Sequence, residues 1–131
     1  MANRPSTVRL TRIVLLVDSL LWLAFAVFTG VGAHPSFGPM SEYMWPVTLL
    51  ALLATALLGG LSVHLGNPSP LGYWLAVGFL AAMILASLFD QFGLADLIFV
   101  TAIALPLLLL VKDRAWYLHP GVTTERERGA A

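Results

Sequence analysis

The sequence predicts an all-α fold, a membrane-embedded antiparallel bundle of four helices with both termini in the cytoplasm. Hydrophobic residues make up 59% of the 131 residues and charged residues 11%, whereas soluble domains average about 45–50% and about 25%. Four apolar runs approach the ~20 residues with which a helix crosses the hydrocarbon core. Every lysine and arginine lies outside those runs.

The four runs cover residues 13–31, 45–63, 71–89 and 94–111. The spacers between them are rich in glycine and proline, which favour turns and end helices. Lipid cannot hydrogen-bond a free backbone N–H or C=O, so runs of this length are expected to be helices. Gly93, just after the third run, suits a positive φ at a helix end.

The distribution of charge predicts the orientation. All seven basic side chains lie in two tails, residues 1–12 and 112–131: Arg4, Arg9, Arg12, Lys112, Arg114, Arg126 and Arg128. Because basic segments stay on the cytoplasmic side, both tails are expected inside the cell, which requires an even number of crossings. Residues 65–70 then form a cytoplasmic hairpin, and the two acidic connections face outward.

Two other interpretations concern the ends of the chain. Residues 31–33 resemble a signal-peptide cleavage site, but a signal peptide has an apolar region of about 7–15 residues. The first run is longer and contains Asp18, so a transmembrane helix is preferred. Residues 123–131 have no apolar face to bury and are expected to be disordered.

Small residues and aromatic residues predict how the helices pack. Small side chains four residues apart let membrane helices approach closely, and such rows occur at Ala26/Gly30, Ala51/Thr55/Gly59, Ala56/Gly60 and Gly78/Ala82/Ala86. We expect these rows to hold the bundle together, with a homo-oligomer interface as the alternative. Paired aromatics, among them Tyr73 with Trp74 and Trp116 with Tyr117, are expected at the membrane interfaces. Pro106 is expected to kink the fourth helix.

Asp18 is the first candidate for a functional group, because a charged side chain at mid-membrane costs ~2.5–3.5 kcal/mol. If Ile13 marks the inner edge of the membrane, Asp18 lies about 7 Å inside it. Ser62, His64 and Lys112 are expected near that depth as partners. Two interpretations stay open: a proton- or cation-exchanging carboxylate, and a structural anchor held by a salt bridge or hydrogen bonds.

A second polar group is expected on the outer side, formed by His34, Glu42, Asp90 and Asp96. An imidazole and carboxylates are ligand types that hold divalent cations. No ligand-type spacing joins the four residues, and an acid such as Asp96 in the first turn of a helix also complements the helix dipole. A metal site is therefore kept only as a third interpretation, and no metal ligand is assigned.

Several classes of function are not supported by the residues. The absence of cysteine excludes disulfides, thiolate metal sites and cysteine nucleophiles. No P-loop, dinucleotide fingerprint or zinc-protease motif is present, and no histidines face each other at mid-membrane to ligate a haem. We predict no cofactor, no enzymatic activity and no nucleic-acid partner. The expected partners are the lipid bilayer and other membrane subunits or a second copy.

The C-terminal half contains an F-D-x-F-G-L-A-D turn at residues 89–96, an apolar helix with a proline, and a K-D-R-A-W-Y-L exit at residues 112–118. With these features it resembles a stretch of small uncharacterised bacterial membrane proteins of four helices. It implies a four-helix architecture in a bacterial inner membrane. It implies nothing about activity, because those proteins have no assigned activity. The format is also similar to that of small multidrug resistance-type exporters, which are dimers around a glutamate, although the acid here is Asp18 and no later motif matches.

These observations favour a non-enzymatic accessory or oligomeric component of the inner (plasma) membrane. The alternative is a dimeric, proton-coupled transporter of small molecules that uses Asp18.

Overall fold

The computed structural model describes residues 4–34, 42–89, 93–119, 121, 125 and 128–130, and these residues form helices and turns without any strand. The helices are α1 (Ser6–Gly30), α2 (Met44–His64), α3 (Pro70–Leu88), α4 (Leu94–Lys112) and α5 (Arg114–Leu118). Within the described part, α1, α2 and α3 are long and apolar enough to cross a membrane. The prediction of an all-helical fold is confirmed for these residues, with three helices that could span a membrane. α4 occupies the range of the fourth predicted span but is not among those three.

The start of α1 differs from the prediction, since the helix begins at Ser6 rather than at residue 13. Pro5 directly precedes it, and proline suits the beginning of a helix because its missing N–H needs no partner there. Residues 6–12 are partly polar but contain no glycine or proline that would interrupt a helix, so the helix continues through them. The predicted tail 1–12 is therefore partly helical. The predicted tail 112–131 is also partly helical, because it contains α5. The disorder expected for residues 123–131 falls mostly outside the described residues.

The turns that flank α3 follow from local chemistry. Ser69 caps α3, and its hydroxyl accepts a hydrogen bond from the N–H of Gly72 at 3.1 Å. The positive φ predicted for Gly93 is wrong, because its φ is −111°. Gly93 instead precedes α4, and its N–H donates to Oδ2 of Asp96 at 2.8 Å. Among the described residues the glycine with a positive φ is Gly32, at 71°, just after α1.

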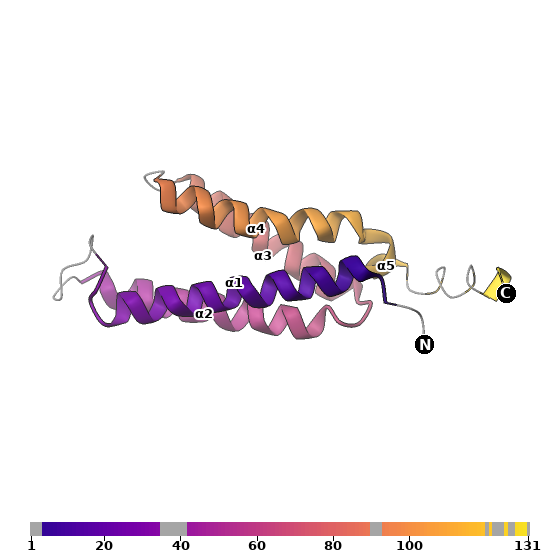
Figure 1. Ribbon diagram of the computed structural model, residues 1–131, viewed down its shortest axis with the longest axis horizontal. Helices are drawn as coiled ribbons and strands as arrows, with labels where there is room; N and C mark the ends of the chain where they lie inside the picture. The colour runs from indigo at the N-terminus through magenta and orange to yellow at the C-terminus, as the bar shows by residue number, and fades with distance from the viewer. Residues whose placement is uncertain are drawn as a thin grey trace.

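Helices α1 and α2 form the most extensive contact between elements, and they lie side by side in Figure 1. Polar contacts join them at three levels: Arg12 with Ser62, Ser19 with Thr55 and Thr29 with Thr48. The partners along α2 follow in reverse order, so the two helices run in opposite directions. Ser19 and both threonines of the Thr29–Thr48 pair are buried, which makes these contacts interior ones.

Two of the small-residue rows lie in this contact. A Cβ added at Gly59 would come within 3.3 Å of Oγ of Ser19, and one at Gly30 within 3.3 Å of Cγ2 of Thr48. Ala26 and Ala51 of the same rows are buried. The close approach of α1 and α2 therefore depends on the absence of larger side chains at these positions.

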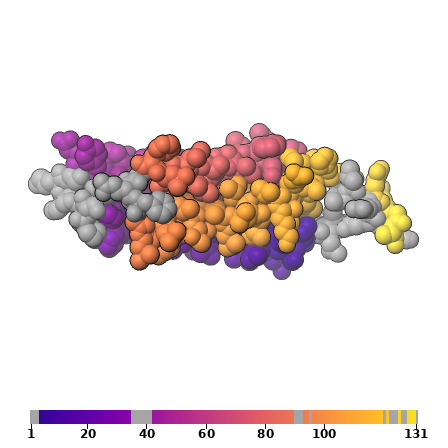
Figure 2. Space-filling view, turned by 90° about the horizontal axis from the view of Figure 1, so that it is seen from above, coloured from indigo at the N-terminus to yellow at the C-terminus, as the bar shows by residue number. Residues whose placement is uncertain are grey.

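The other long helices, α3 and α4, pack against each other, and α4 also packs against α1, whereas α2 and α3 have little contact. Figure 2 shows α3 and α4 covering the face seen from above. Near α5, the rings of Tyr73 and Tyr117 lie 5.8 Å apart. Both tyrosines are buried, whereas Trp74 is exposed. Two of the aromatics expected at the membrane interface are therefore part of the core.

We predict that Gly59→Leu destabilises the protein because it overpacks the α1–α2 contact, whereas Gly60→Leu causes no overpacking. A Cβ at position 60 meets nothing within 4 Å, in contrast to the crowded position 59. Overpacking a helix contact typically costs about 1–3 kcal/mol, and both variants gain the same helix propensity. Thermal unfolding in detergent micelles measures the difference. An equal loss of stability in the two variants would contradict this description of the α1–α2 contact.

Candidate functional site

Asp18 lies at the midpoint of α1, which runs from Ser6 to Gly30. At 1.5 Å per residue it stands about 18 Å from either end of the helix. The sequence placed it closer to the inner end because the helix was expected to begin at residue 13. The seven additional residues at the start of α1 move Asp18 to the centre of the helix without changing its distance from Ile13.

The carboxyl group of Asp18 is buried and incompletely hydrogen-bonded. The side chain is 3% exposed, and its Oδ2 has no hydrogen-bond partner. One turn later, the indole Nε1 of Trp22 is also buried without a partner. A buried polar group that lacks a partner costs about 1–3 kcal/mol. Packing alone therefore gives no reason for these two polar side chains.

Two contacts define how α1 and α4 are aligned. Near the start of α1, the hydroxyl of Thr7 donates to Oδ1 of Asp113 at 2.8 Å. Further along, the rings of Trp22 and Phe99 lie 5.4 Å apart. The later residue of α1 thus meets the earlier residue of α4, so these helices also run in opposite directions.

Interpolation between these contacts puts Asp18 between the levels of Ala102 and Ile103 on α4. Pro106, which is fully buried within α4, has no N–H to donate to the carbonyl of Ala102 four residues before it. That carbonyl therefore lacks its usual helical donor at the level of a buried acid. A protonated carboxyl or an indole N–H is the kind of donor that such a carbonyl accepts.

The structure does not bring the expected partners to Asp18. Ser62 is bonded to Arg12, six residues from Asp18, which is about 9 Å along the helix. His64 lies beside the turn into α3, where a Cβ at Gly72 would come within 2.9 Å of its Nε2. Lys112 is exposed and lies at the end of α4 that meets the first turns of α1.

The outer residues are also placed apart from one another. The ring of His34 packs against Phe25 at 5.8 Å, Glu42 is exposed in the turn before α2, and Asp96 caps α4. Asp90 lies outside the described residues. Within the described part of the chain, no group of three His, Cys, Asp or Glu side chains could hold a metal ion.

A polar cluster that the sequence did not indicate joins the start of α1 to α5. Oδ2 of Asp113 and the hydroxyl of Tyr117 are buried there without partners. Burial, together with the nearby charge of Asp113, raises the pKa of Tyr117 to about 12, against the opposing effects of Arg12 and Arg4. More than one hundred residues separate Thr7 from Asp113, so no local pattern could have revealed this contact.

No protein-family model, no curated protein and no solved structure matches the chain. The residues themselves are therefore the basis for inferring a function.

We predict that Asp18→Leu stabilises the protein by about 1–3 kcal/mol, because it removes a buried carboxylate oxygen without a partner. The matched variant Asp96→Leu is expected to cost about 1 kcal/mol, because it removes the cap of α4. Thermal unfolding in detergent compares the two. If Asp18→Leu lowers stability as much as Asp96→Leu does, Asp18 is a hydrogen-bonded anchor.

Proposed function

We propose that the chain is a non-enzymatic component of the inner (plasma) membrane that crosses the bilayer four times and assembles with a further membrane helix. Both termini lie in the cytoplasm in this proposal. The 19 residues of α4 extend about 28 Å at 1.5 Å per residue, close to the ~30 Å thickness of the hydrocarbon core. Its acid, Asp96, is in its first turn and its base, Lys112, is its last residue.

The orientation is supported by the placement of the basic residues. α5 lies beside the start of α1 (Figure 1), where Thr7 binds Asp113. An even number of crossings brings the two ends of a bundle together in this way. Arginines of α1 and of the C-terminal segment thus share one end of the bundle, as the preference of basic residues for the cytoplasmic side requires.

The open small-residue row of α3 is the observation that carries the proposed assembly. Gly78, Ala82 and Ala86 share one face of α3 and are all exposed. A Cβ at Gly78 would meet nothing within 4 Å. Two rows with the same spacing, Ala26/Gly30 of α1 and Ala51/Thr55/Gly59 of α2, are closed by a neighbouring helix. In a membrane such a face favours helix association, because the backbones can approach closely.

A second row, on α2, is open in the same way. Ala56 and Gly60 are exposed, and a Cβ at Gly60 meets nothing within 4 Å. Since α2 and α3 have little contact with each other, neither row is covered by the other's helix. The proposal assigns the primary contact to α3, whose row is longer by one position.

We predict that the double variant Gly78→Ile with Ala82→Ile abolishes assembly, because two branched side chains hold a partner helix away from α3. The control is Ala24→Ile, which adds one such branched side chain at an exposed position of α1 outside the rows. Cross-linking followed by pull-down from native membranes measures the assembly, and two differently tagged copies distinguish self-association from another subunit. A wild-type protein that always migrates alone as a monomer would contradict the proposal.

Proton-coupled transport is the second candidate, and the burial of Asp18 is the observation that favours it. Ionisable groups within membrane segments are commonly functional. A structural anchor would be expected to use its buried oxygens in hydrogen bonds, and Oδ2 of Asp18 has no partner among the described residues. The carbonyl of Ala102 lacks its helical donor because of Pro106, and it lies near the level of Asp18, which makes it a candidate acceptor for the proton of Asp18.

For that candidate we predict that Asp18→Asn abolishes transport driven by a pH gradient. Asparagine keeps the shape of the side chain but cannot take up or release the proton. The measurement is the uptake of a lipophilic dye cation by proteoliposomes under an imposed pH gradient, with Asp96→Asn as the matched control. Unchanged uptake in Asp18→Asn would exclude Asp18 as the exchanging group.

A further inference from the structure

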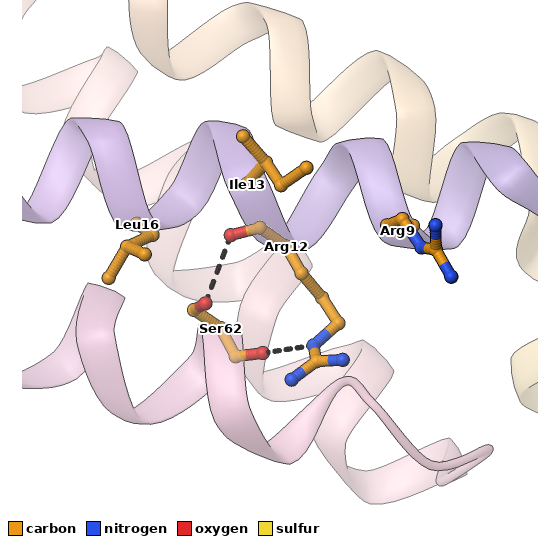
Figure 3. A pocket seen from close by; sticks show the side chains of 5 residues that line it. All are labelled: Arg9, Arg12, Ile13, Leu16 and Ser62. Atoms are coloured by element: carbon orange, nitrogen blue, oxygen red, sulfur yellow. Dashed lines mark hydrogen bonds between the residues drawn. The ribbon is translucent and has the colours of Figure 1, made fainter.

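A pocket lies on the α1–α2 pair near the start of α1 (Figure 3). It is lined by Arg9, Arg12, Ile13, Leu16 and Ser62, and its volume is about 210 Å³. That volume is below the ~300–1,000 Å³ of sites for drug-sized ligands. The pocket therefore suits one small polar group rather than a whole organic molecule.

The side chain of Arg12 is held in place on the wall of this pocket. Its Nε donates to the carbonyl of Ser62 at 2.7 Å, and the hydroxyl of Ser62 donates to the carbonyl of Arg12 at 2.9 Å (Figure 3). Gly66 leaves room for the guanidinium, since a Cβ there would lie 3.2 Å from Cζ and 3.3 Å from Nη1. Among the described residues, no hydrogen bond or ion pair uses the terminal nitrogens of Arg12.

Arg9 adds a second cation one helical turn earlier. Residues three apart lie on the same side of a helix, and Arg9 is exposed. Within the described part of the chain, no carboxylate pairs with Arg9 or Arg12. The pocket thus carries two positive charges that no acid there neutralises, and several N–H donors remain free.

Apolar side chains follow the two arginines along α1. Ile13 is 52% exposed and Leu16 is 50% exposed, so both present apolar surface beside the cations. From the start of α1 toward its centre, the pocket therefore presents charged side chains first and apolar side chains second. A phospholipid has the same order of groups, with a phosphate at the surface and acyl chains below it.

We propose that this pocket binds the phosphate group of an anionic phospholipid, with an acyl chain along Ile13 and Leu16. A guanidinium with free terminal nitrogens matches phosphate oxygens in geometry and charge. Basic pockets between membrane helices on the cytoplasmic side bind lipid headgroups. The adjacent apolar surface favours a lipid over a free phosphate ion, which gains nothing from Ile13 and Leu16.

The test is native mass spectrometry of the delipidated full chain in detergent, titrated with phosphatidylglycerol or phosphatidylcholine. Wild type is expected to retain one phosphatidylglycerol in preference to phosphatidylcholine. Arg9→Gln and Arg12→Gln are each expected to weaken that binding about fivefold. Arg114→Gln, which removes an exposed charge outside the pocket, is expected to leave it unchanged. Arg9 makes no hydrogen bond to the described residues, so its variant keeps the α1–α2 contact intact.

Three results would overturn the proposal. Equal retention of both lipids would remove the requirement for an anionic headgroup. An equal loss of binding in Arg114→Gln would indicate diffuse attraction to net charge rather than a site. Displacement of the lipid by glycerol phosphate at the same concentration would assign the pocket to a soluble phosphate compound.

Discussion

The hydroxyl of Ser19 donates to the carbonyl of Thr55 at 2.8 Å, in the middle of the contact between α1 and α2 on which the rest of the fold depends. In lipid, apolar side chains gain little by moving from the acyl chains to another helix, so close packing and buried hydrogen bonds hold the helices together. Such a hydrogen bond contributes only about 0.6 kcal/mol. The stability of the pair therefore also depends on close packing, which Gly30 and Gly59 permit where they meet Thr48 and Ser19.

The second pair of helices takes its position from α1. α4 packs on α1 and α3 packs on α4, while α2 and α3 have little contact. One helix consequently presents polar groups to two neighbours: Ser19 to α2, and the side of Asp18 and Trp22 to α4. The proposed lipid pocket uses the same helix two turns earlier, at Arg9 and Arg12. Changes in the alignment of α1 would thus affect the candidate proton site and the lipid site together.

Local sequence signals were sufficient to predict most of the helix ends. α2, α3 and α4 begin and end within one residue of the predicted ranges, because glycine and proline interrupt the chain between them. The start of α1 was missed because it depends on Pro5 rather than on the first apolar residue. The position of Asp18 at the midpoint of α1 follows from that start, whereas its distance from Ile13 is the one predicted.

The side-chain contacts could not be read from the sequence, because they join distant segments. Arg12 meets Ser62 across 50 residues and Thr7 meets Asp113 across 106. The position of Asp18 within an apolar run predicted it as an unusual group, but its lack of a hydrogen-bond partner at Oδ2 depends on how the helices pack. Likewise, four rows of small residues look alike in the sequence, and only packing distinguishes the closed rows from the open ones.

The central proposal is that four helices cross the membrane, with both ends of the described chain in the cytoplasm. The chain has no cysteine, so single cysteines can be introduced at Ala33, Asn67, Leu94 and His119 and labelled in intact cells with a membrane-impermeant maleimide. The account predicts labelling at positions 33 and 94, and at positions 67 and 119 only after permeabilisation. Labelling of positions 94 and 119 from the same side would show that α4 does not cross, and would contradict it.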